Sequence, residues 1–276
     1  MIYPFVSFHR HAICVSVIRT LSRGEGRVNQ LIAQKRVSRG RTQARYRVRF
    51  VDGRADFEAA LALRGRVFRG GASDADQFDD LCRHMVIERL EDGAVVGAFR
   101  VMSFACGAEI ARSYSAQSYG LSALAAYPAP MLELGRFCIA PEVSDPDILR
   151  VAWGGLARIV DEEGIAFLFG CSSFRGTDAG RYRDAFALLR ERFLAPKAWA
   201  PTVKASEVAG LGSDVSDRGR ALKAMPPLLR SYLTMGGWVS DHAVVDRDMD
   251  TLHVFTGLEI ASIPAARARS IRASVL

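Results

Sequence analysis

Hydrophobic and polar positions along the chain change their spacing in a regular order, and each spacing is typical of one kind of element. Residues 44–52 alternate with the period of a half-buried strand. Residues 56–68 have the spacing of a helix with Asp56 at its N-cap. Residues 84–104 predict a β-hairpin, because two apolar runs flank the turn-forming sequence Glu-Asp-Gly at residues 91–93.

The second half of the chain continues with strands and helices in turn. The clearest signal is an amphipathic helix over residues 145–164, with Asp145 as N-cap, Pro146 in the first turn and Gly164 beyond the end. Strands that alternate with helices, after an early hairpin, predict an α/β fold with a sheet of mixed direction. The other predicted elements are a short helix 115–127, buried strands 129–140 and 165–174, a helix 178–194 that begins at Asp178, a loop or weak strand 195–221, a short helix 226–237 and a late strand 253–260.

Charged side chains interrupt these apolar elements. Arg64 lies in the first helix, Arg100 at the end of a strand, and Glu133 and Arg136 in a buried strand. A buried charge costs several kcal/mol unless it is paired or used. We therefore expect one polar site inside an apolar fold, to which the loop after the first helix adds Asp74, Asp76 and Asp79.

The composition is that of a globular protein, with 49% hydrophobic and 24% charged residues in a chain of 276. No apolar stretch reaches the roughly 18 residues that span a bilayer. The five cysteines are scattered without CxxC spacing, so we expect neither a disulfide framework nor a zinc site, and a reducing cytoplasm fits best. Cys138 and Cys171 are expected to be core residues, and Cys171 lacks the partner base of a nucleophile. The sequence DADQFDD lacks the glycine and final glutamate of a calcium loop, so no metal is expected.

The formal charge of +7 is unevenly distributed. Residues 1–50 hold eleven basic side chains and one acidic side chain, Glu25, so this segment has a net charge of +10 and the remainder −3. Such a segment suits phosphate-rich surfaces, either lipid headgroups or nucleic acid. Two interpretations of residues 1–43, which we call the leader, stay open. It docks on an anionic membrane surface, or it is a poorly ordered extension or lies upstream of the true start.

Short motifs in a fixed order connect the chain to a known family. It resembles the acyl-homoserine-lactone synthases in Arg64-xxx-Phe68, Asp74-x-Asp76-xx-Asp79, Gly97-xx-Arg100 and Glu133-xx-Arg136. It departs from them at Asp74, where Glu is usual, and in lacking a Trp after Phe68. Longer segments look like a sister family, the ornithine lipid N-acyltransferases, with Arg175 where Pro is usual: LFGCSSFRGTD (168–178), PPLLRSYLTMGGWV (226–239) and VVDRDMDT (244–251). The resemblance covers roughly residues 45–260.

The resemblance implies a GNAT-like α/β fold, in which a mixed, mostly antiparallel central sheet is flanked by helices and two central strands separate to seat an acyl thioester. It implies an acyltransferase domain at residues 44–262, followed by a tail, residues 263–276. The implied enzyme moves a 3-hydroxyacyl chain from the phosphopantetheine of acyl carrier protein to the α-amine of L-ornithine, which gives lyso-ornithine lipid. No bound cofactor and no nucleic acid partner is expected. Because the product is an amphiphile, we expect a cytoplasmic protein that works at the inner face of the membrane.

Acylation of an amine needs a base, since an ammonium ion has no lone pair with which to attack a thioester. Glu133 is the candidate general base, because burial on its strand would raise its pKa toward the working pH. The alternative is that Glu133 forms a buried ion pair with Arg136 or Arg100. On a regular strand, positions 133 and 136 point to opposite faces, so either a bulge intervenes or the two residues have different roles.

The other candidates are assigned to substrate binding. Arg100 and Arg136 each offer a planar fork for the α-carboxylate of the acceptor, or they pair with the aspartates of the loop. Those aspartates receive the cationic side chain of ornithine, or they hold Arg64 and Arg100 in place. The candidate binding residues are Arg64, Phe68, Asp76, Asp79, Arg100 and Arg136, with Asp74, His84 and Ser172 in a second tier.

The donor is expected to be acyl carrier protein and not CoA. CoA-dependent GNAT enzymes cradle the pyrophosphate with a glycine-rich loop at a helix N-terminus. The corresponding loop here, residues 140–146, reads APEVSDP, with no glycine and two acids. Rival acceptors are glycine, glutamine and lysine, and a lactone synthase is a further rival. A protein of another class, which binds membranes or nucleic acid through the leader, would lose its function without residues 1–43, whereas an enzyme would keep its turnover. The sequence leaves the acyl chain length and the oligomeric state open.

Overall fold

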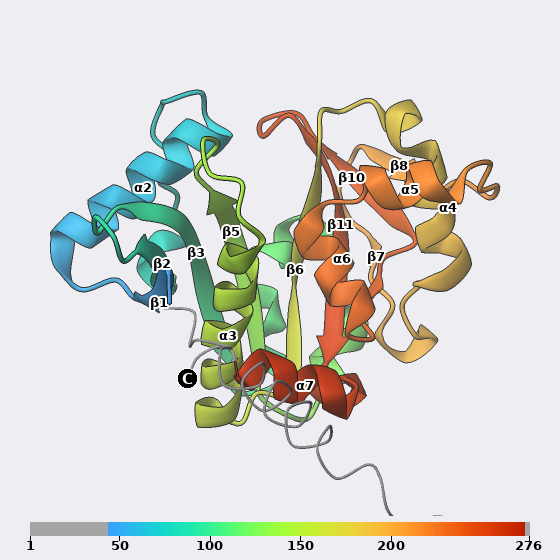
Figure 1. Ribbon diagram of the computed structural model, residues 1–276. Coiled ribbons are helices and arrows are strands. Elements are labelled where there is room, and N and C mark those ends of the chain that lie inside the picture. The colour runs from blue at the N-terminus through green and yellow to red at the C-terminus, as the bar shows by residue number, and fades with distance from the viewer. Residues whose placement is uncertain (1–43, 274–276) are drawn as a thin grey trace, which may run out of the picture. The chain divides into compact units, whose positions relative to one another are not determined.

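A computed structural model describes residues 44–273 of the chain (Figure 1). Nine strands form one sheet in the order β1-β2-β3-β5-β6-β11-β10-β8, with β9 beside β11. Within the described residues, β5 and β6 make the one parallel pairing of this sheet, so the mixed, mostly antiparallel sheet is confirmed. Its strands are β1 (Tyr46–Phe50), β2 (Arg83–Arg89), β3 (Val95–Phe104), β5 (Met131–Ile139), β6 (Phe167–Arg175), β8 (Val208–Gly210), β9 (Trp238–Val239), β10 (His242–Asp246) and β11 (Thr251–Glu259); a small second sheet pairs β4 (Tyr119–Gly120) with β7 (Thr202–Val203).

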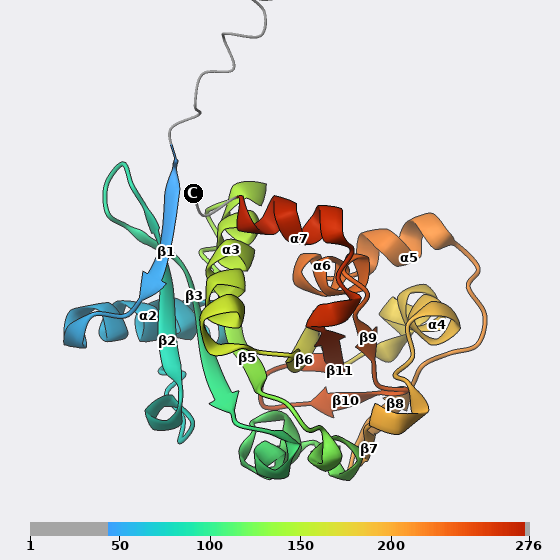
Figure 2. The same cartoon turned by 90° about the horizontal axis from the view of Figure 1, so that it is seen from below.

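Helices cover both faces of the large sheet (Figure 2). α3 (Pro146–Glu163), α6 (Pro227–Thr234) and α7 (Ala265–Arg272) share one apolar core with the strands. α2 (Gly53–Phe68) packs on the opposite face. Val86 of β2 belongs to the apolar cluster under α2, whereas its neighbours Met85 and Ile87 belong to the core shared with α3. The other helices are α4 (Arg183–Arg192), α5 (Arg218–Ala224) and the 3-10 helices η1 (Asp79–Leu81), η2 (Gly107–Arg112), η3 (Ser115–Gln117), η4 (Ser122–Ala126), η5 (Ala179–Tyr182), η6 (Lys197–Trp199) and η7 (Ile260–Ser262).

α3 begins and ends where the sequence predicts. The carboxylate of Asp145 accepts a hydrogen bond from the backbone N–H of Asp147 at 3.0 Å, and Pro146 occupies the first turn. Gly164 closes the helix with a φ of 63°, a left-handed conformation that glycine adopts without steric cost.

Other local predictions are wrong. α2 begins at Gly53, so Asp56 lies in its first turn and pairs with Arg49 of β1 instead of capping the helix. Residues 115–127 form η3, β4 and η4 instead of one helix, because Tyr119 is buried and its hydroxyl donates to the backbone oxygen of His253 at 2.7 Å. Asp178 is the N-cap of the helical stretch as predicted, but that stretch begins with η5 before α4. The expected tail contains α7.

The described chain contains no helix with the length and apolar character needed to cross a bilayer. The leader lies outside the described residues, as do residues 274–276. At the other end of the described chain, the guanidinium of Arg272 binds the carboxylate of Asp161 at 2.6 Å, which ties α7 to α3.

β5 and β6 separate part-way along the sheet. Their parallel pairing runs from Met131 opposite Phe167 to Glu133 opposite Phe169, where it ends. Figure 1 shows the two strands diverging beyond this point. Glu133 therefore stands where the strands separate.

A bulge in β5 follows immediately. Arg100 of β3 pairs with Gly135, and Ala98 pairs with Cys138, so two residues of β5 lie opposite one residue of β3. Arg136, in the bulge, has a φ of 52°. A non-glycine residue in this region is strained and persists only where its surroundings hold it. Of the two alternatives for positions 133 and 136, the bulge is confirmed.

Candidate active site

The charged residues singled out in the sequence meet beside the bulge of β5. α2 supplies one arginine, β3 and β5 supply one each, and the segment from residue 74 to η1 supplies three aspartates. Their side chains are linked by hydrogen bonds into one group. We call this group the Arg–Asp cluster: Arg64, Asp74, Asp76, Asp79, Arg100 and Arg136.

The buried part of the cluster is centred on Arg64, which is 1% exposed. Its Nε donates to Oδ2 of Asp74 at 2.9 Å, and its Nη1 donates to Oδ1 of Asp79 at 2.6 Å. Arg100, which is 2% exposed, donates to the same Asp79 oxygen at 2.6 Å. One carboxylate thus joins two buried guanidinium groups, and loss of either kind of partner would leave an uncompensated charge.

Arg136 approaches the same aspartates from the bulge. Its Nε donates to Asp74 and its Nη2 donates to Asp76, each at 3.0 Å. Asp76 also accepts hydrogen bonds from both Nη groups of Arg100, at 2.6 and 2.9 Å. The ring of Tyr114 lies 4.9 Å from the Arg136 guanidinium carbon. These contacts hold the strained backbone of Arg136 in place.

The electrostatics of the cluster favour ionised carboxylates. Burial acts to raise the pKa of Asp76 and Asp79, but the hydrogen bonds and charges of their arginine partners outweigh it, so each pKa lies below the ordinary 3.8. The alternative in which the aspartates hold Arg64 and Arg100 in place is confirmed.

Glu133 is not in an ion pair. Its Oε2 accepts the backbone N–H of Tyr114 at 2.8 Å, and its Oε1 accepts the N–H and the hydroxyl of Ser115 at 2.8 and 2.6 Å. No arginine among residues 44–273 lies within ion-pair distance of it, so the alternative of an ion pair with Arg100 or Arg136 is wrong. Burial raises the pKa of Glu133, and the three hydrogen bonds act against that rise.

A polar cleft of about 690 Å³ opens beside the Arg–Asp cluster. The loop after α2 and the turn between β10 and β11 meet at this cleft, where Arg69 binds the carboxylate of Asp248 at 2.8 Å. A volume of this size is typical of a small-molecule site. The lining residues that bear on its chemistry are Asp76, Phe78, Tyr114, Arg136, Asp246 and Asp248.

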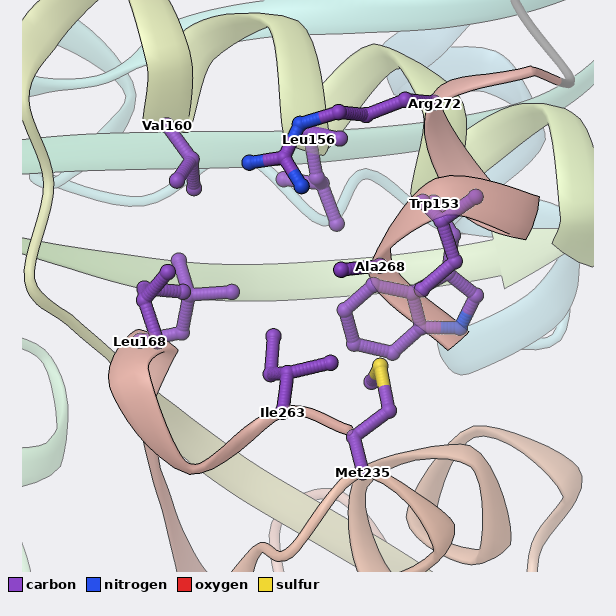
Figure 3. Close-up of a pocket in the computed structure, with 11 residues that line it drawn as sticks. Trp153, Leu156, Val160, Leu168, Met235, Ile263, Ala268 and Arg272 are labelled. Atoms are coloured by element: carbon purple, nitrogen blue, oxygen red, sulfur yellow. The ribbon is translucent and has the colours of Figure 1, made fainter. Parts of the chain in front are cut away.

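A second cavity, of about 80 Å³, lies between α3, α7 and β6 (Figure 3). Its lining is apolar apart from Arg272, whose guanidinium pairs with Asp161. Leu168, which lines it, pairs with Leu132 just before β5 and β6 separate. Figure 3 shows Trp153, Leu156 and Val160 of α3 facing Leu168, Met235, Ile263 and Ala268 across this space.

The remaining candidates lie outside the cleft. Phe68 packs in the apolar cluster under α2 and lines neither cavity. His84 places its Nε2 2.9 Å from the backbone oxygen of Asp79 and so contacts the cluster from β2, and burial lowers its pKa. Ser172 accepts a hydrogen bond from a threonine of β11 at 2.9 Å. Burial raises the pKa of Cys171 to about 12, which disfavours a reactive thiolate.

Known proteins are similar in sequence to much of this chain. The acetyltransferase (GNAT) domain family matches residues 54–154. L-ornithine N(alpha)-acyltransferase of Rhodobacter capsulatus is 34% identical over 227 residues, which are 76% of this chain and 88% of that protein. The chain belongs to the L-ornithine N(alpha)-acyltransferase family. It is an N-acyltransferase, and the resemblance inferred from the motifs is confirmed.

A second relative has the same name, and two solved structures are similar to this chain. The L-ornithine N(alpha)-acyltransferase of Brucella abortus is 29% identical over 238 residues, which are 78% of this chain and 85% of that protein. The structure of FeeM, an N-acyl amino acid synthase from uncultured soil microbes, has a TM-score of 0.46 at 10% identity and covers 79% of this chain and 92% of its own. The AHL synthase LasI has a TM-score of 0.41 at 17% identity, with 84% and 96% covered.

The site of this acyltransferase also contains residues that the sequence analysis missed. Tyr114 and Ser115 bind Glu133. Ser115 stood at the start of the segment 115–127, predicted as a plain helix, and Tyr114 directly before it, so nothing in the pattern marked them. Asp246 lines the cleft at the end of β10. It lies within the VVDRDMDT segment that carried the family resemblance, and that segment was the available signal.

Proposed function

We propose that the protein transfers a 3-hydroxyacyl chain from acyl carrier protein to the α-amine of L-ornithine, giving lyso-ornithine lipid. The observation that carries this proposal is the 34% identity with a named L-ornithine N(alpha)-acyltransferase over 88% of that protein. The chemistry of the cleft fits an amino-acid acceptor, since both guanidinium and carboxylate groups line it. The acyltransferase domain is proposed to begin near residue 44, because every candidate site residue lies beyond that point.

The two cavities suggest how the substrates divide between the faces of the sheet. The polar cleft would hold the acceptor, and the apolar cavity under α3 and α7 would take part of the acyl chain. Leu168 and Glu133 both belong to the short paired stretch of β5 and β6, so the cavity and the proposed base meet the same end of the strand separation. A thioester seated in the separation would have its carbonyl between the two.

In the proposed reaction the amine nitrogen attacks the thioester carbonyl, the carbon–sulfur bond breaks, and the carrier thiol takes up a proton. Glu133 is proposed to accept the proton that the amine loses. Its raised pKa suits this role, and its Oε2 accepts a single hydrogen bond in the structure, which leaves a lone pair for the amine or for one bridging water.

The proposed donor is acyl carrier protein, and the N-terminus of α3 supports this choice. Asp145 caps the helix and binds Arg45, and Asp147 in the first turn binds the same arginine. A helix N-terminus attracts anions, but here two carboxylates already occupy it. The pyrophosphate of CoA would meet like charge at this position, whereas a carrier-bound phosphopantetheine has no pyrophosphate.

The experiment is an acylation assay with purified protein, with product identified by mass spectrometry. Ornithine, lysine, glutamine and glycine are compared as acceptors with 3-hydroxyacyl carrier protein as donor, and the matching acyl-CoA is compared as donor with ornithine. We expect the highest kcat/KM for ornithine with the carrier protein. Preferred acylation of glycine or glutamine would overturn the proposal that ornithine is the acceptor. Equal kcat/KM with the two donors would overturn the proposal that acyl carrier protein is the donor.

The proposed product is an amphiphile, so we place the enzyme in the cytoplasm at the inner face of the membrane. The basic leader would strengthen attraction to anionic lipid, at about 1 kcal/mol for each basic residue near the surface. This part of the proposal rests on the charge of residues 1–43 alone.

A further inference from the structure

The carboxylates that line the cleft differ in what neutralises them. Asp76 accepts hydrogen bonds from Arg100 and Arg136. Asp248 pairs with Arg69 at 2.8 Å, and its side chain is 78% exposed. Asp246 has no cationic partner among the described residues, and its Oδ1 accepts the backbone N–H of Met249 at 3.0 Å.

The position of Asp246 is fixed by the strand and the turn. It ends β10, where it pairs with Thr251 of β11. The bond from Met249 anchors its carboxylate within the turn between the two strands. The neighbouring cation, Arg247, binds Glu207 and is not available to it. The uncompensated carboxylate is therefore a built feature of the cleft wall and not a mobile surface charge.

Asp246 lines the cleft together with Tyr114 and Arg136. Its charge acts to raise the pKa of Tyr114, Cys171 and His253. Tyr114 also lies against Arg136, whose guanidinium carbon is 4.9 Å from its ring centroid. A cation and an unpaired carboxylate thus lie within electrostatic reach of one tyrosine in the same cleft.

We propose that Asp246 binds the side-chain ammonium of the acceptor amino acid and sets the preference for a diamino acid. The inference rests on the proposed function and adds the residue that selects the acceptor. An ammonium donates charge-assisted hydrogen bonds to a carboxylate, and such a bond is strongest where the carboxylate has no other cation. Asp246 takes the role that the sequence offered to Asp74, Asp76 and Asp79, which was to bind the cationic side chain of ornithine. The oxygens of those three aspartates are bound by arginines.

An acceptor without a side-chain cation would cover the half-buried Asp246 and leave its charge without a cationic partner. Buried polar groups that a wrong substrate leaves unpaired are a strong source of discrimination. Glutamine and glycine are therefore selected against by the same residue that binds ornithine. Lysine also has a side-chain ammonium that can pair with Asp246, so the enzyme can distinguish it from ornithine only by its extra methylene.

The test is Asp246→Asn, because asparagine keeps the oxygen that accepts the Met249 N–H and removes the charge. Asp250→Asn is the matched control. It makes the same change in the same turn, outside the cleft lining, at a φ of 48° that asparagine tolerates. Steady-state kinetics are measured with ornithine and with glutamine at saturating donor, together with the KM for donor and the thermal unfolding midpoint.

We expect Asp246→Asn to raise the KM for ornithine roughly ten- to hundredfold, which is the scale of a lost hydrogen bond to a charged group. The kcat/KM for glutamine should stay level or rise, and the KM for donor should not change. If Asp246 had a structural role alone, the substitution would lower kcat/KM equally for both acceptors and would lower the thermal unfolding midpoint. Asp250→Asn should resemble the wild type in every measurement.

The outcomes separate this inference from the proposed function. If the wild type prefers ornithine and Asp246→Asn keeps that preference, the role of Asp246 is overturned and the proposed function stands. If the wild type prefers glutamine or glycine, the proposed function is overturned, and the role of Asp246 is overturned with it, because the acceptor then has no side-chain cation.

Discussion

Replacing Glu133 with glutamine has two effects that follow from its hydrogen bonds. The carboxylate accepts one bond from Tyr114 and two from Ser115, whereas glutamine has a single accepting oxygen. If that oxygen keeps both bonds from Ser115, the NH2 group faces the backbone N–H of Tyr114. One buried N–H is then without an acceptor, which costs about 1–3 kcal/mol of folding free energy. Loss of a general base separately costs about a hundred- to ten-thousandfold in turnover.

The assay is kcat/KM against pH, with thermal unfolding of the same preparations. The wild type should lose activity as the pH falls through the raised pKa of Glu133, and that acidic limb should be absent from Glu133→Gln. Ser115→Ala is the matched variant, because it keeps the carboxylate and removes a hydrogen bond to its ionised form. The pKa of Glu133 then rises further, so the acidic limb should move to higher pH. If Glu133→Gln keeps near wild-type turnover per folded molecule and the same limb, the assignment of Glu133 as base is refuted.

Three further results are expected. Asp79→Asn leaves Arg64 and Arg100 without their shared anion, so urea unfolding should show a loss of about 3–5 kcal/mol; a loss under about 1 kcal/mol would contradict the burial argument. Because the folded pKa values of Asp76 and Asp79 lie below 3.8, their contribution to stability is present above pH 3.8 and is lost as the pH falls through the lowered values. The urea midpoint should fall there, and less steeply in Asp79→Asn. The chain without residues 1–43 should keep its kcat/KM but bind anionic vesicles more weakly at low salt; equal co-sedimentation would contradict a membrane role for the leader.

The elements that could be predicted from sequence are those whose signals are local. α3 has its cap, its first-turn proline and its closing glycine within the segment itself, so its bounds follow from the pattern. Residues 115–127 have a helical composition, but their conformation depends on partners far along the chain. The hydroxyl of Tyr119 binds His253, and Glu133 binds the N–H groups of Tyr114 and Ser115. Both sets of contacts depend on residues outside the segment, so no pattern within it predicts them.

The candidate site shows the same division. The cost of burying charge marks Arg64, Arg100, Glu133 and Arg136 individually, and all four are buried or nearly so. The sequence offered the loop aspartates as partners of the arginines in one of two alternatives. It could not decide how Glu133 and Arg136 are placed, because a single residue of register, here the bulge at Arg136, changes which face a side chain occupies.

The charge count around the cleft bears on the choice of acceptor. Among the charged residues that line the cleft, the arginines pair with carboxylates, Asp76 and Asp248 pair with arginines, and Asp246 has no cationic partner among the described residues. A ligand with one net positive charge completes this balance, and ornithine with both amines protonated has that charge, as lysine has. Glycine and glutamine have none. The wild type should therefore discriminate against glutamine by a larger factor than against lysine, since one methylene is worth only about 10- to 200-fold. Asp246→Asn should remove the first difference and leave the second. The side chain of glutamine is as long as that of ornithine, so stronger discrimination against lysine than against glutamine in the wild type would mean that length, and not charge, selects the acceptor.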